Sequence, residues 1–378
     1  MDTRTGLPVV GMIGGGQLAR MTHQAAIALG QSLRVLAANP DDGAALVAAD
    51  TTVGAHTDLD ALLAFAKECD VVTFDHEHVP GDHIRALVAA GAVVRPGADA
   101  LLHAQDKRVM RERLSGLGVP VPRWAPVRSA DDLAEFGSRV GWPVVVKAER
   151  GGYDGRGVWV VGSPDEAPSG THLIVEERVP LVRELAAVVA RSPFGQVAVY
   201  PVVETVQQDG ICVEVIAPAP GLSDERAVRA QNLAIRIATE LDVVGLLAVA
   251  LFDTGTDLLV NELAMRPHNS AHWTIEGART SQFEQHLRAV LDYPMGDTSL
   301  TAPVVVMANV LGGTNGNPMT IDERLHHMFA AEPGVKVHLY GKQVRPGRKI
   351  GHVTALGDEL SSVRASAARA ATMLSEGA

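Results

Sequence analysis

The chain has 378 residues, 47% of them hydrophobic, which predicts two or three domains with well-buried cores. Its formal net charge of −11 argues against a nucleic-acid partner, because phosphate-backbone binding needs a basic face. It has two cysteines and no apolar run of about 18 residues, so we expect a cytoplasmic protein with no disulfide framework and no membrane span.

The first hundred residues alternate short β-branched runs with alanine-rich stretches of helical character. Strands are predicted at 7–14, 33–39, 70–75 and 92–97, with helices at 17–30, 59–68 and 83–91. Such alternation is typical of a parallel sheet built from βα units. A further helix is predicted at 106–118, and the prolines after it indicate a connection.

Beyond residue 122 the predicted strands follow one another more closely. They lie at 142–148, 157–162, 173–179, 183–191, 197–207 and 211–217. A long helix at 225–241 precedes a hairpin at 245–262, whose turn is predicted at Thr254-Gly255-Thr256. Strands at 304–313, 335–342 and 348–357 indicate a small strand-rich C-terminal part. The fold class is therefore α/β followed by α+β.

The first candidate site is the segment Gly14-Gly15-Gly16-Gln17-Leu18-Ala19, between a predicted strand and helix. Backbone amides at a helix N-terminus favour a phosphate or carboxylate, and glycine allows close approach. An NAD site would also need an acid at the end of the second strand, where Asn39 lies. We favour an anion pocket. A tight turn without a ligand stays open as the alternative.

The second candidate is the segment KAERGGYDGRGVWV, in which Lys147 leaves a strand and four glycines follow. It is not a Walker A loop, because its glycines precede a strand where a P-loop would precede a helix. A glycine-rich hairpin can fold over nucleotide phosphates, and the lysine would supply positive charge. A flexible hairpin with a surface lysine is the alternative.

Two further polar clusters follow strands late in the chain. Residues 261–270 read NELAMRPHNS, and their carboxylate and amide oxygens suit Mg²⁺. A solvated loop is the weaker alternative there, because burying such a strand end without purpose is costly. Arg345-Pro346-Gly347-Arg348-Lys349, with Lys342 before it, could hold a phosphate or form a solvated charged face.

Histidines near residue 77 invite a zinc hypothesis. His76, Glu77 and His78 are consecutive, and His83 is near. Adjacent residues of a strand do not easily converge on one ion, and the chain has no H-E-x-x-H helix. We therefore disfavour zinc and expect Glu77 to contact a substrate.

Taken together, these segments resemble one family. GGGQL, GGYDGRG after a strand-end lysine, NELA-x-R-x-HNS-x-HW and RPGRK-x-GH occur in the order typical of N5-carboxyaminoimidazole ribonucleotide synthetases, which are ATP-grasp ligases of bacterial purine biosynthesis. The resemblance implies a Rossmann-like domain at 1–103, an ATP-grasp domain at 104–300 and a small C-terminal domain at 301–378. It also implies a homodimer, two Mg²⁺, and carboxylation of 5-aminoimidazole ribonucleotide by ATP and bicarbonate through carboxyphosphate.

The same resemblance implies roles for individual residues. The ATP-binding residues would be His103, Lys107, Lys147, Gly152, Tyr153, Asp154, Gly155, Arg156, Gly157, Val158, Glu176, Glu177, Arg178, Val179, Glu184, Gln207, Asn261 and Glu262, with Glu262 also a metal ligand. Arg266, His268 and Asn269 would hold bicarbonate and carboxyphosphate, and Asp154 and Arg156 would join them in catalysis. Gln17, Leu18, Glu77, Tyr153, Lys342, Arg345 and Arg348 would bind the ribonucleotide.

The chain departs from the family pattern at two positions. Ala250 stands where the family has a magnesium-binding glutamate, and Asp253 has an odd offset that places it on the opposite face of the strand. Ala271 replaces a glycine, which would strain a turn requiring positive φ. Alternatives are therefore a nucleotide-binding homologue impaired in catalysis, or a related ATP-grasp enzyme with another acceptor amine.

Overall fold

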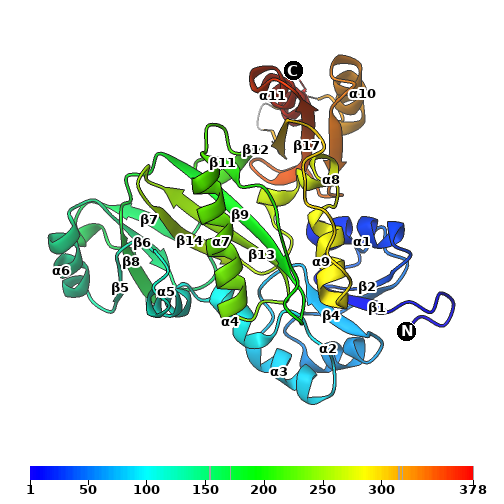
Figure 1. Ribbon diagram of the computed structural model, residues 1–378, viewed down its shortest axis with the longest axis horizontal. Helices are drawn as coiled ribbons and strands as arrows, with labels where there is room; N and C mark the ends of the chain where they lie inside the picture. The colour runs from blue at the N-terminus through cyan, green and yellow to red at the C-terminus, as the bar shows by residue number, and fades with distance from the viewer. Residues whose placement is uncertain (153–154, 171, 314–315, 317, 378) are drawn as a thin grey trace.

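The computed structural model describes residues 1–152, 155–170, 172–313, 316 and 318–377, and these residues form three β-sheets. Figure 1 shows the N-terminal sheet with its helices on one side of the molecule, a small lobe around α6 on the other, and a large sheet between them. The C-terminal helices lie at the end of the large sheet. The large sheet thus forms the middle of the molecule.

The N-terminal sheet is parallel, as predicted. Its order is β3 (Thr51–Val53), β2 (Ser32–Ala37), β1 (Val9–Ile13) and β4 (Val71–Phe74), with helices α1 (Gln17–Ala28), α2 (Leu59–Ala66) and α3 (Gly81–Ala89). The strand predicted at 92–97 is wrong, since only an isolated bridge from Val72 to Val94 forms there. Val94 is buried beside β4 while Val93 is exposed, so only one residue of this apolar run packs into the core.

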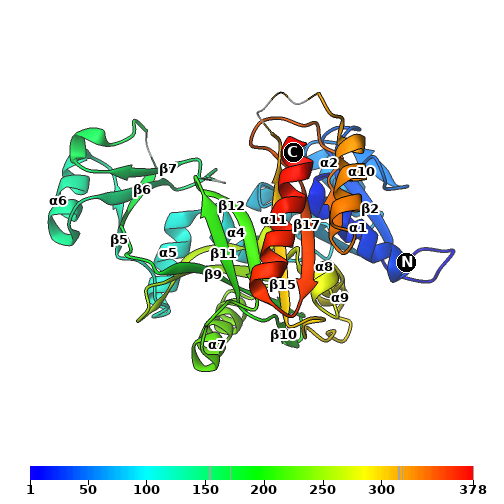
Figure 2. The same cartoon turned by 90° about the horizontal axis from the view of Figure 1, so that it is seen from above.

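The small lobe is an antiparallel sheet with one covering helix. Its strand order is β5 (Trp124–Val127), β8 (Leu173–Glu177), β6 (Val144–Ala148) and β7 (Val158–Val161), and α6 (Ala130–Val140) packs on it. Helices α4 (Ala98–Gln105) and α5 (Lys107–Gly116) connect it to the N-terminal sheet, and η1 spans Pro164–Glu166. Seen from above, the lobe stands apart from the rest of the molecule (Figure 2).

Within the described residues, the large sheet has nine strands. Its order is β14 (Leu258–Ala264), β13 (Gly245–Asp253), β9 (Arg183–Arg191), β11 (Val203–Gln208), β12 (Ile211–Ala217), β15 (Val304–Leu311), β17 (Lys349–Gly357) and β16 (Lys336–Leu339), and β10 (Val197–Val199) also pairs with β9. The hairpin predicted at 245–262 is confirmed as β13 and β14. The strand predicted at 197–207 is divided near Pro201, which lacks an N–H for the ladder.

The C-terminal strands extend this large sheet, because β15 pairs with β12. Helices α10 (Ile321–Ala331) and α11 (Leu360–Glu376) pack on them around a buried apolar cluster that includes Val353 and Leu374. The strand-rich C-terminal part therefore shares its sheet with the preceding residues. Its strand-end side chains are placed by the same ladder that forms the centre of the molecule.

Helix α9 (Gln282–Leu291) joins the N-terminal sheet to the large sheet. It follows helix α7 (Asp224–Glu240) and the short helices η2 (Asn269–Ala271) and α8 (Thr274–Gly277) in the chain. The buried His286 on α9 lies 2.8 Å from Thr73 Oγ1 of β4 through Nε2, and its Nδ1 accepts a hydrogen bond from the Leu246 N–H of β13. His286 therefore bridges both sheets as a neutral imidazole.

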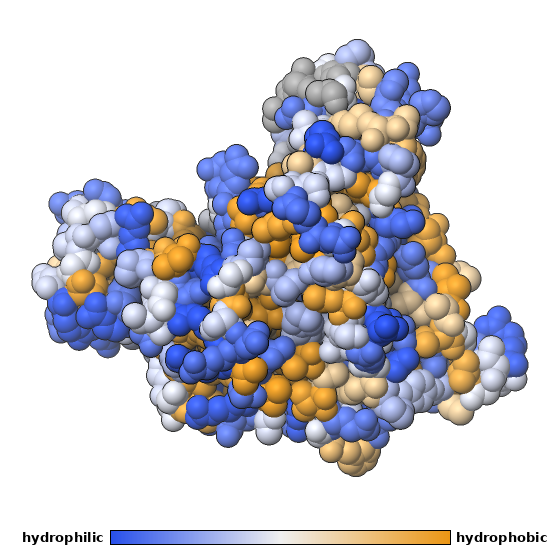
Figure 3. All heavy atoms as spheres, turned by 45° about the horizontal axis from the view of Figure 1, so that its top comes forward, coloured by the Kyte–Doolittle hydropathy of each residue, from blue (hydrophilic) through white to orange (hydrophobic). Residues whose placement is uncertain are grey.

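The outer surface has a mixed character. On the described part of the face in Figure 3, hydrophilic and hydrophobic side chains are interspersed. Among the described residues, no helix is both long and apolar enough to cross a lipid bilayer.

Acid should weaken the fold at His286. Burial lowers the pKa of His286 to about 4, below the value of about 6.5 for an exposed imidazole, so the unfolded chain binds the proton more readily. The stabilisation is present above pH 6.5 and is lost as pH falls towards 4, at about 1.4 kcal/mol per pH unit. Urea unfolding at several pH values should show a smaller pH dependence for His286→Gln. The exposed His326→Gln variant is the control, and an equal change in both would contradict the prediction.

Candidate active site

A cavity of about 980 Å³ lies between the small lobe and the large sheet. It is lined by many of the residues predicted to bind ATP, bicarbonate or carboxyphosphate: Lys107, Lys147, Gly152, Gly155, Arg156, Val158, Glu176, Glu177, Arg178, Val179, Glu184, Gln207, Asn261, Glu262, His268 and Asn269. We call it the larger cavity. Tyr153 and Asp154 lie outside the described residues. The structure thus gathers residues from distant parts of the chain around one space.

The glycine-rich segment lines the larger cavity, and several of its residues have positive φ angles. Gly151, Gly155 and Gly157 have φ values of 78°, 76° and 72°, which residues other than glycine rarely adopt. A Cβ on Gly152 would lie 2.9 Å from the Arg156 carbonyl oxygen. The backbone conformation and the close packing of this segment therefore require glycine, and without side chains its backbone lies close to the cavity.

A β-bulge explains how two successive residues face the same cavity. In β14, Glu262 pairs with Ala250 and Val260 pairs with Leu251, so Asn261 is the extra residue. Successive residues of a regular strand point to opposite faces. The bulge therefore lets both Asn261 and Glu262 line the larger cavity.

The wall of the larger cavity contains two cations bound to one carboxylate. Glu176 Oε1 lies 2.8 Å from Arg111 Nε, and Glu176 Oε2 lies 2.7 Å from Lys147 Nζ. All three side chains are buried. Burial raises the pKa of Glu176, but the two cations more than offset this, so its pKa lies below its usual value. Lys147 is therefore held at the cavity by its own counter-ion.

This network also reaches the bulge. Lys147 Nζ donates to Asn261 Oδ1 at 3.0 Å, and Arg111 Nη2 donates to the Asn261 backbone oxygen at 2.7 Å.

Sequence reasoning missed Arg111. The available signal was its spacing of four residues from Lys107 on one helix face. It also missed Thr205, Cys212 and Phe252, which line the larger cavity, whereas Lys349 of the predicted basic cluster lines this cavity as well.

Two carboxylates face the larger cavity near each other. Burial, and then the charge of Glu262, raise the pKa of Glu184 to about 6. This repulsion between carboxylates is what a bound cation would relieve. Within the described ranges, no three His, Cys, Asp or Glu side chains could hold a metal by themselves. The donor set fits Mg²⁺, which usually takes one or two carboxylates together with substrate phosphates.

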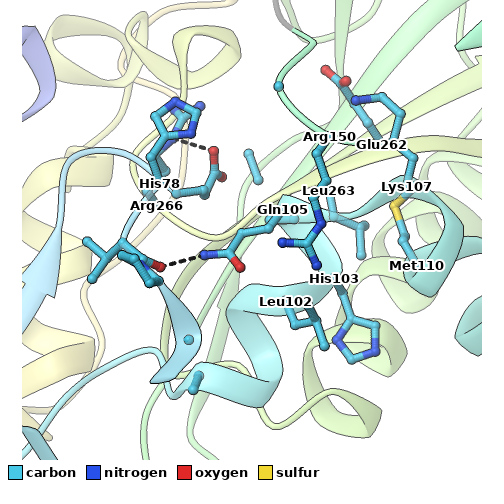
Figure 4. A pocket seen from close by; sticks show the side chains of 18 of the residues that line it. His78, Leu102, His103, Gln105, Lys107, Met110, Arg150, Glu262, Leu263 and Arg266 are labelled. Carbon is cyan, nitrogen blue, oxygen red and sulfur yellow. Dashed lines mark hydrogen bonds and ion pairs between the residues drawn. The ribbon is translucent and has the colours of Figure 1, made fainter. Parts of the chain in front are cut away.

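A second cavity of about 610 Å³ adjoins the first. Lys107, Gly152, Glu262 and His268 line both cavities. Figure 4 shows Lys107 and Glu262 at one side of the second cavity, Arg266 at the other, and Gln105 between them. His103, predicted to bind ATP, lines this second cavity, where burial lowers the pKa of its imidazole.

Glu77 and Arg266 connect the N-terminal sheet to the second cavity. Glu77 Oε2 lies 3.0 Å from Arg266 Nε, and its Oε1 accepts a hydrogen bond from the Met265 N–H at 3.0 Å. The two side chains were predicted to contact different substrates, and the structure places them in direct contact. They would therefore lie where those substrates meet.

The arrangement of His76, His78 and Glu77 does not support a zinc site. His76 packs against His56 and His78, with ring centroids 4.7 Å and 5.4 Å apart, and Glu77 is engaged by Arg266 and Met265. Burial, followed by the neighbouring His56, lowers the pKa of His76 to about 3. The three rings pack against one another, and His76 is a neutral member of this cluster.

The predicted ribonucleotide residues are only partly brought together. Lys342 Nζ donates to Gln17 Oε1 at 2.5 Å, which joins the C-terminal part to the first glycine-rich turn. The Leu18 side chain instead is buried with Met21 and other apolar residues. Arg345 and Arg348 lie exposed on the loop before β17, and each donates a hydrogen bond to Gln343.

Three family models match successive parts of the chain. A ribonucleotide synthetase preATP-grasp domain matches residues 7–105, an ATP-grasp domain matches 112–283, and a phosphoribosylaminoimidazole carboxylase C-terminal domain matches 305–366. The N5-carboxyaminoimidazole ribonucleotide synthase of Mycobacterium tuberculosis H37Rv is 59% identical over 98% of this chain and 88% of that protein. This chain belongs to the N5-carboxyaminoimidazole ribonucleotide synthase family. The corresponding Corynebacterium ammoniagenes protein is 50% identical over 98% of this chain and 92% of its own length.

Solved structures of the family share the whole fold. The synthetase from Thermus thermophilus is 40% identical and superposes with a TM-score of 0.87, covering 97% of this chain and 99% of its own. The Aspergillus clavatus synthase, described in complex with ADP and 5-aminoimidazole ribonucleotide, is 31% identical, with a TM-score of 0.88 over 97% and 98% of the two chains. The ATP-grasp fold is thereby confirmed.

The structure also clarifies the departures from the family pattern. Ala250 lies beside Glu262 on the cavity wall, so a glutamate there would face the same space. Asp253 is buried and bound to Arg183 and Arg226, as expected for the opposite face of the strand. It does not replace the missing carboxylate.

The strain considered at Ala271 is not observed. Ala271 is buried in the 3₁₀ helix η2, and its φ is not positive. An alanine fits that backbone as readily as a glycine.

Removing Arg111 should destabilise the chain. Arg111→Met would leave the buried Glu176 with one cation, and breaking such a pair costs about 3–5 kcal/mol. We expect a lower urea midpoint than for the original chain. Arg108→Met is the matched control on the same helix. Arg108 is exposed, with an exposed partner in Glu112 and a long 3.9 Å contact to Glu149, so its loss should change the midpoint little. Equal shifts in both variants would exclude a special role for the buried network.

Proposed function

We propose that the larger cavity binds ATP and that the chain uses it to carboxylate 5-aminoimidazole ribonucleotide. In this reaction bicarbonate attacks the γ-phosphorus, which gives ADP and carboxyphosphate. The exocyclic amine of the ribonucleotide then takes the carboxyl group, and phosphate and a proton leave. The product is N5-carboxyaminoimidazole ribonucleotide, formed in purine biosynthesis.

The observation that carries this proposal is the junction of the two cavities. Lys107, Glu262 and His268 line both, so the phosphate end of a nucleotide in the larger cavity would reach the space beside Arg266. Phosphoryl transfer asks the protein mainly for positioning and charge neutralisation. The lysines Lys107 and Lys147 supply that charge to ATP.

His268 is suited to donate a hydrogen bond at this junction. Its Nδ1 accepts from the Ser270 N–H at 3.3 Å and lies 2.9 Å from Ser270 Oγ, and on this basis we assign the imidazole proton to Nε2. Burial, followed by the charge of Arg266, lowers the pKa of His268 to about 3, so the ring is neutral at physiological pH. We assign Arg266 to bind the bicarbonate and carboxyphosphate anions and His268 to donate to their oxygens.

Metal and loop complete the proposed site. Glu262, with Glu184 near it, would hold Mg²⁺, which when bound would neutralise charge on the phosphate oxygens. We assign Tyr153, Asp154 and Arg156 to the loop that covers ATP and meets the ribonucleotide. Closure over the site would exclude water, which hydrolyses carboxyphosphate.

The ribonucleotide would lie between Gln17, Glu77 and the basic C-terminal loop. The contact from Lys342 to Gln17 supports this assignment, because it brings both ends of the proposed binding site together. Arg345 and Arg348 would receive the phosphate by moving from their exposed positions. The three-domain division, the homodimer and the cytoplasmic location remain predictions.

The proposed function is tested by ADP release with ATP, Mg²⁺, bicarbonate and 5-aminoimidazole ribonucleotide. We expect release together with formation of the carboxylated product, and loss of product when bicarbonate or the ribonucleotide is omitted. ATP binding without any turnover would instead favour the impaired homologue. Turnover with a different amine only would overturn the substrate assignment.

Introducing a glutamate at position 250 should strengthen magnesium binding. Ala250→Glu would place a second carboxylate beside Glu262, so we expect the Mg²⁺ concentration for half-maximal rate to fall by about tenfold or more. Initial rates across a magnesium series would measure this. Ala250→Gln is the matched control, since it has similar size without the charge. An equal change in the Mg²⁺ requirement of the two variants would contradict the role of the added charge.

A further inference from the structure

Asn309 lies behind the proposed bicarbonate site and is paired with Asn269. The Asn269 Nδ2 donates to Asn309 Oδ1 at 2.9 Å, and Asn309 Nδ2 donates to Asn269 Oδ1 at 2.8 Å. Asn309 Nδ2 also donates to the Cys212 backbone oxygen at 2.8 Å. Asn309 is 5% exposed, so these contacts are made away from bulk water.

The pair sets how Asn269 faces the larger cavity. A primary amide has two N–H donors and an oxygen that accepts two hydrogen bonds. The contact with Asn309 uses one donor and one acceptor position of Asn269, which fixes the orientation of its amide. The remaining N–H and lone pair are available to the cavity that Asn269 lines.

The position of Asn309 is set by the sheet. It lies within β15, where it pairs with His352 of β17, while the adjacent Ala308 pairs with Glu214 of β12. Side chains carried by strands are placed more accurately than those carried by loops. Asn309 therefore fixes the position of the Asn269 side chain, at the start of η2, relative to the sheet.

A second buried amide holds the preceding residue of that loop. The Gln282 side chain accepts from the His268 N–H at 2.8 Å and donates to the His268 carbonyl oxygen at 2.9 Å. The loop is thus held from α9 through its backbone and from β15 through the Asn269 side chain. Asn309 is the contact that orients a side chain facing the cavity.

We propose that Asn309 is a positioning residue for the carboxylation reaction, acting through Asn269. The inference rests on the proposed function, in which Asn269 contacts bicarbonate and carboxyphosphate. It gives the strand β15 of the C-terminal part a role in the phosphoryl-transfer half of the reaction, in addition to the ribonucleotide contacts assigned to Lys342.

A double-mutant cycle tests this role. The variants are Asn309→Leu, Asn269→Ala and the two combined, assayed for kcat and for the KM of ATP and of bicarbonate. We expect Asn309→Leu to lower kcat by about 10- to 100-fold, because small misplacements of a reacting-site group have such effects, with the KM of ATP nearly unchanged. In the Asn269→Ala background, Asn309→Leu should have no further effect on kcat.

Two more variants guard against an effect of misfolding. Asn309→Asp keeps the shape and the acceptor but loses both donated hydrogen bonds, so it should lower kcat in the same way and carries the test if the leucine variant does not fold. Thr354→Val is the matched control, because Thr354 is buried in the adjacent strand β17 and its Oγ1 has no hydrogen-bond partner among the described residues. It should leave kcat unchanged.

The outcomes separate the two proposals. If Asn269→Ala lowers kcat and the Asn309 substitution multiplies that loss, Asn309 does not act through Asn269 and the inference is overturned alone. If Asn269→Ala turns over like the original chain, the role of Asn269 in the proposed function fails, and the inference fails with it. A loss that vanishes in the Asn269→Ala background supports both.

Discussion

The buried contact of Glu176 with Lys147 and Arg111 is the constraint on which the nucleotide cavity depends. Three charges removed from water are tolerable only when they neutralise and hydrogen-bond one another. Satisfying them requires helix α5, strands β6 and β8 and the bulge at Asn261 to meet at one place. The small lobe and the large sheet are therefore joined around the cavity by an electrostatic requirement as well as by apolar packing.

The same principle recurs at the other contacts between parts of the molecule. Glu77 meets Arg266 beside the second cavity, and Lys342 meets Gln17 at the first glycine-rich turn. Each pair contains side chains assigned to substrates. The polar groups that would bind ligands are thus already partnered across the interfaces, so substrate binding would exchange one set of partners for another and couple the parts of the chain.

The residue at position 250 affects the charge of the larger cavity because it lies beside Glu262. The sheet register places it beside Glu262, and Asp253 is committed to Arg183 and Arg226 on the other side of the strand. Glu184 faces the same cavity, and its pKa is raised by burial and then by the charge of Glu262. Glu184 and Glu262 therefore influence each other in this cavity, and a cation bound between them would act on both.

The sequence alone determined where most strands lie along the chain, the parallel N-terminal sheet, the hairpin of β13 and β14, and the glycine-rich and polar segments that border the larger cavity. These features depend on periodicity and on short motifs, which act over a few residues. It did not identify Arg111 or Asn309, the division of the strand near Pro201, or the contact between Glu77 and Arg266. Arg111 contacts Asn261 across 150 positions of sequence and Asn309 contacts Asn269 across 40. Only the tertiary structure decided these pairings, because sheet register and domain packing place the two partners together while nothing local in the sequence relates them.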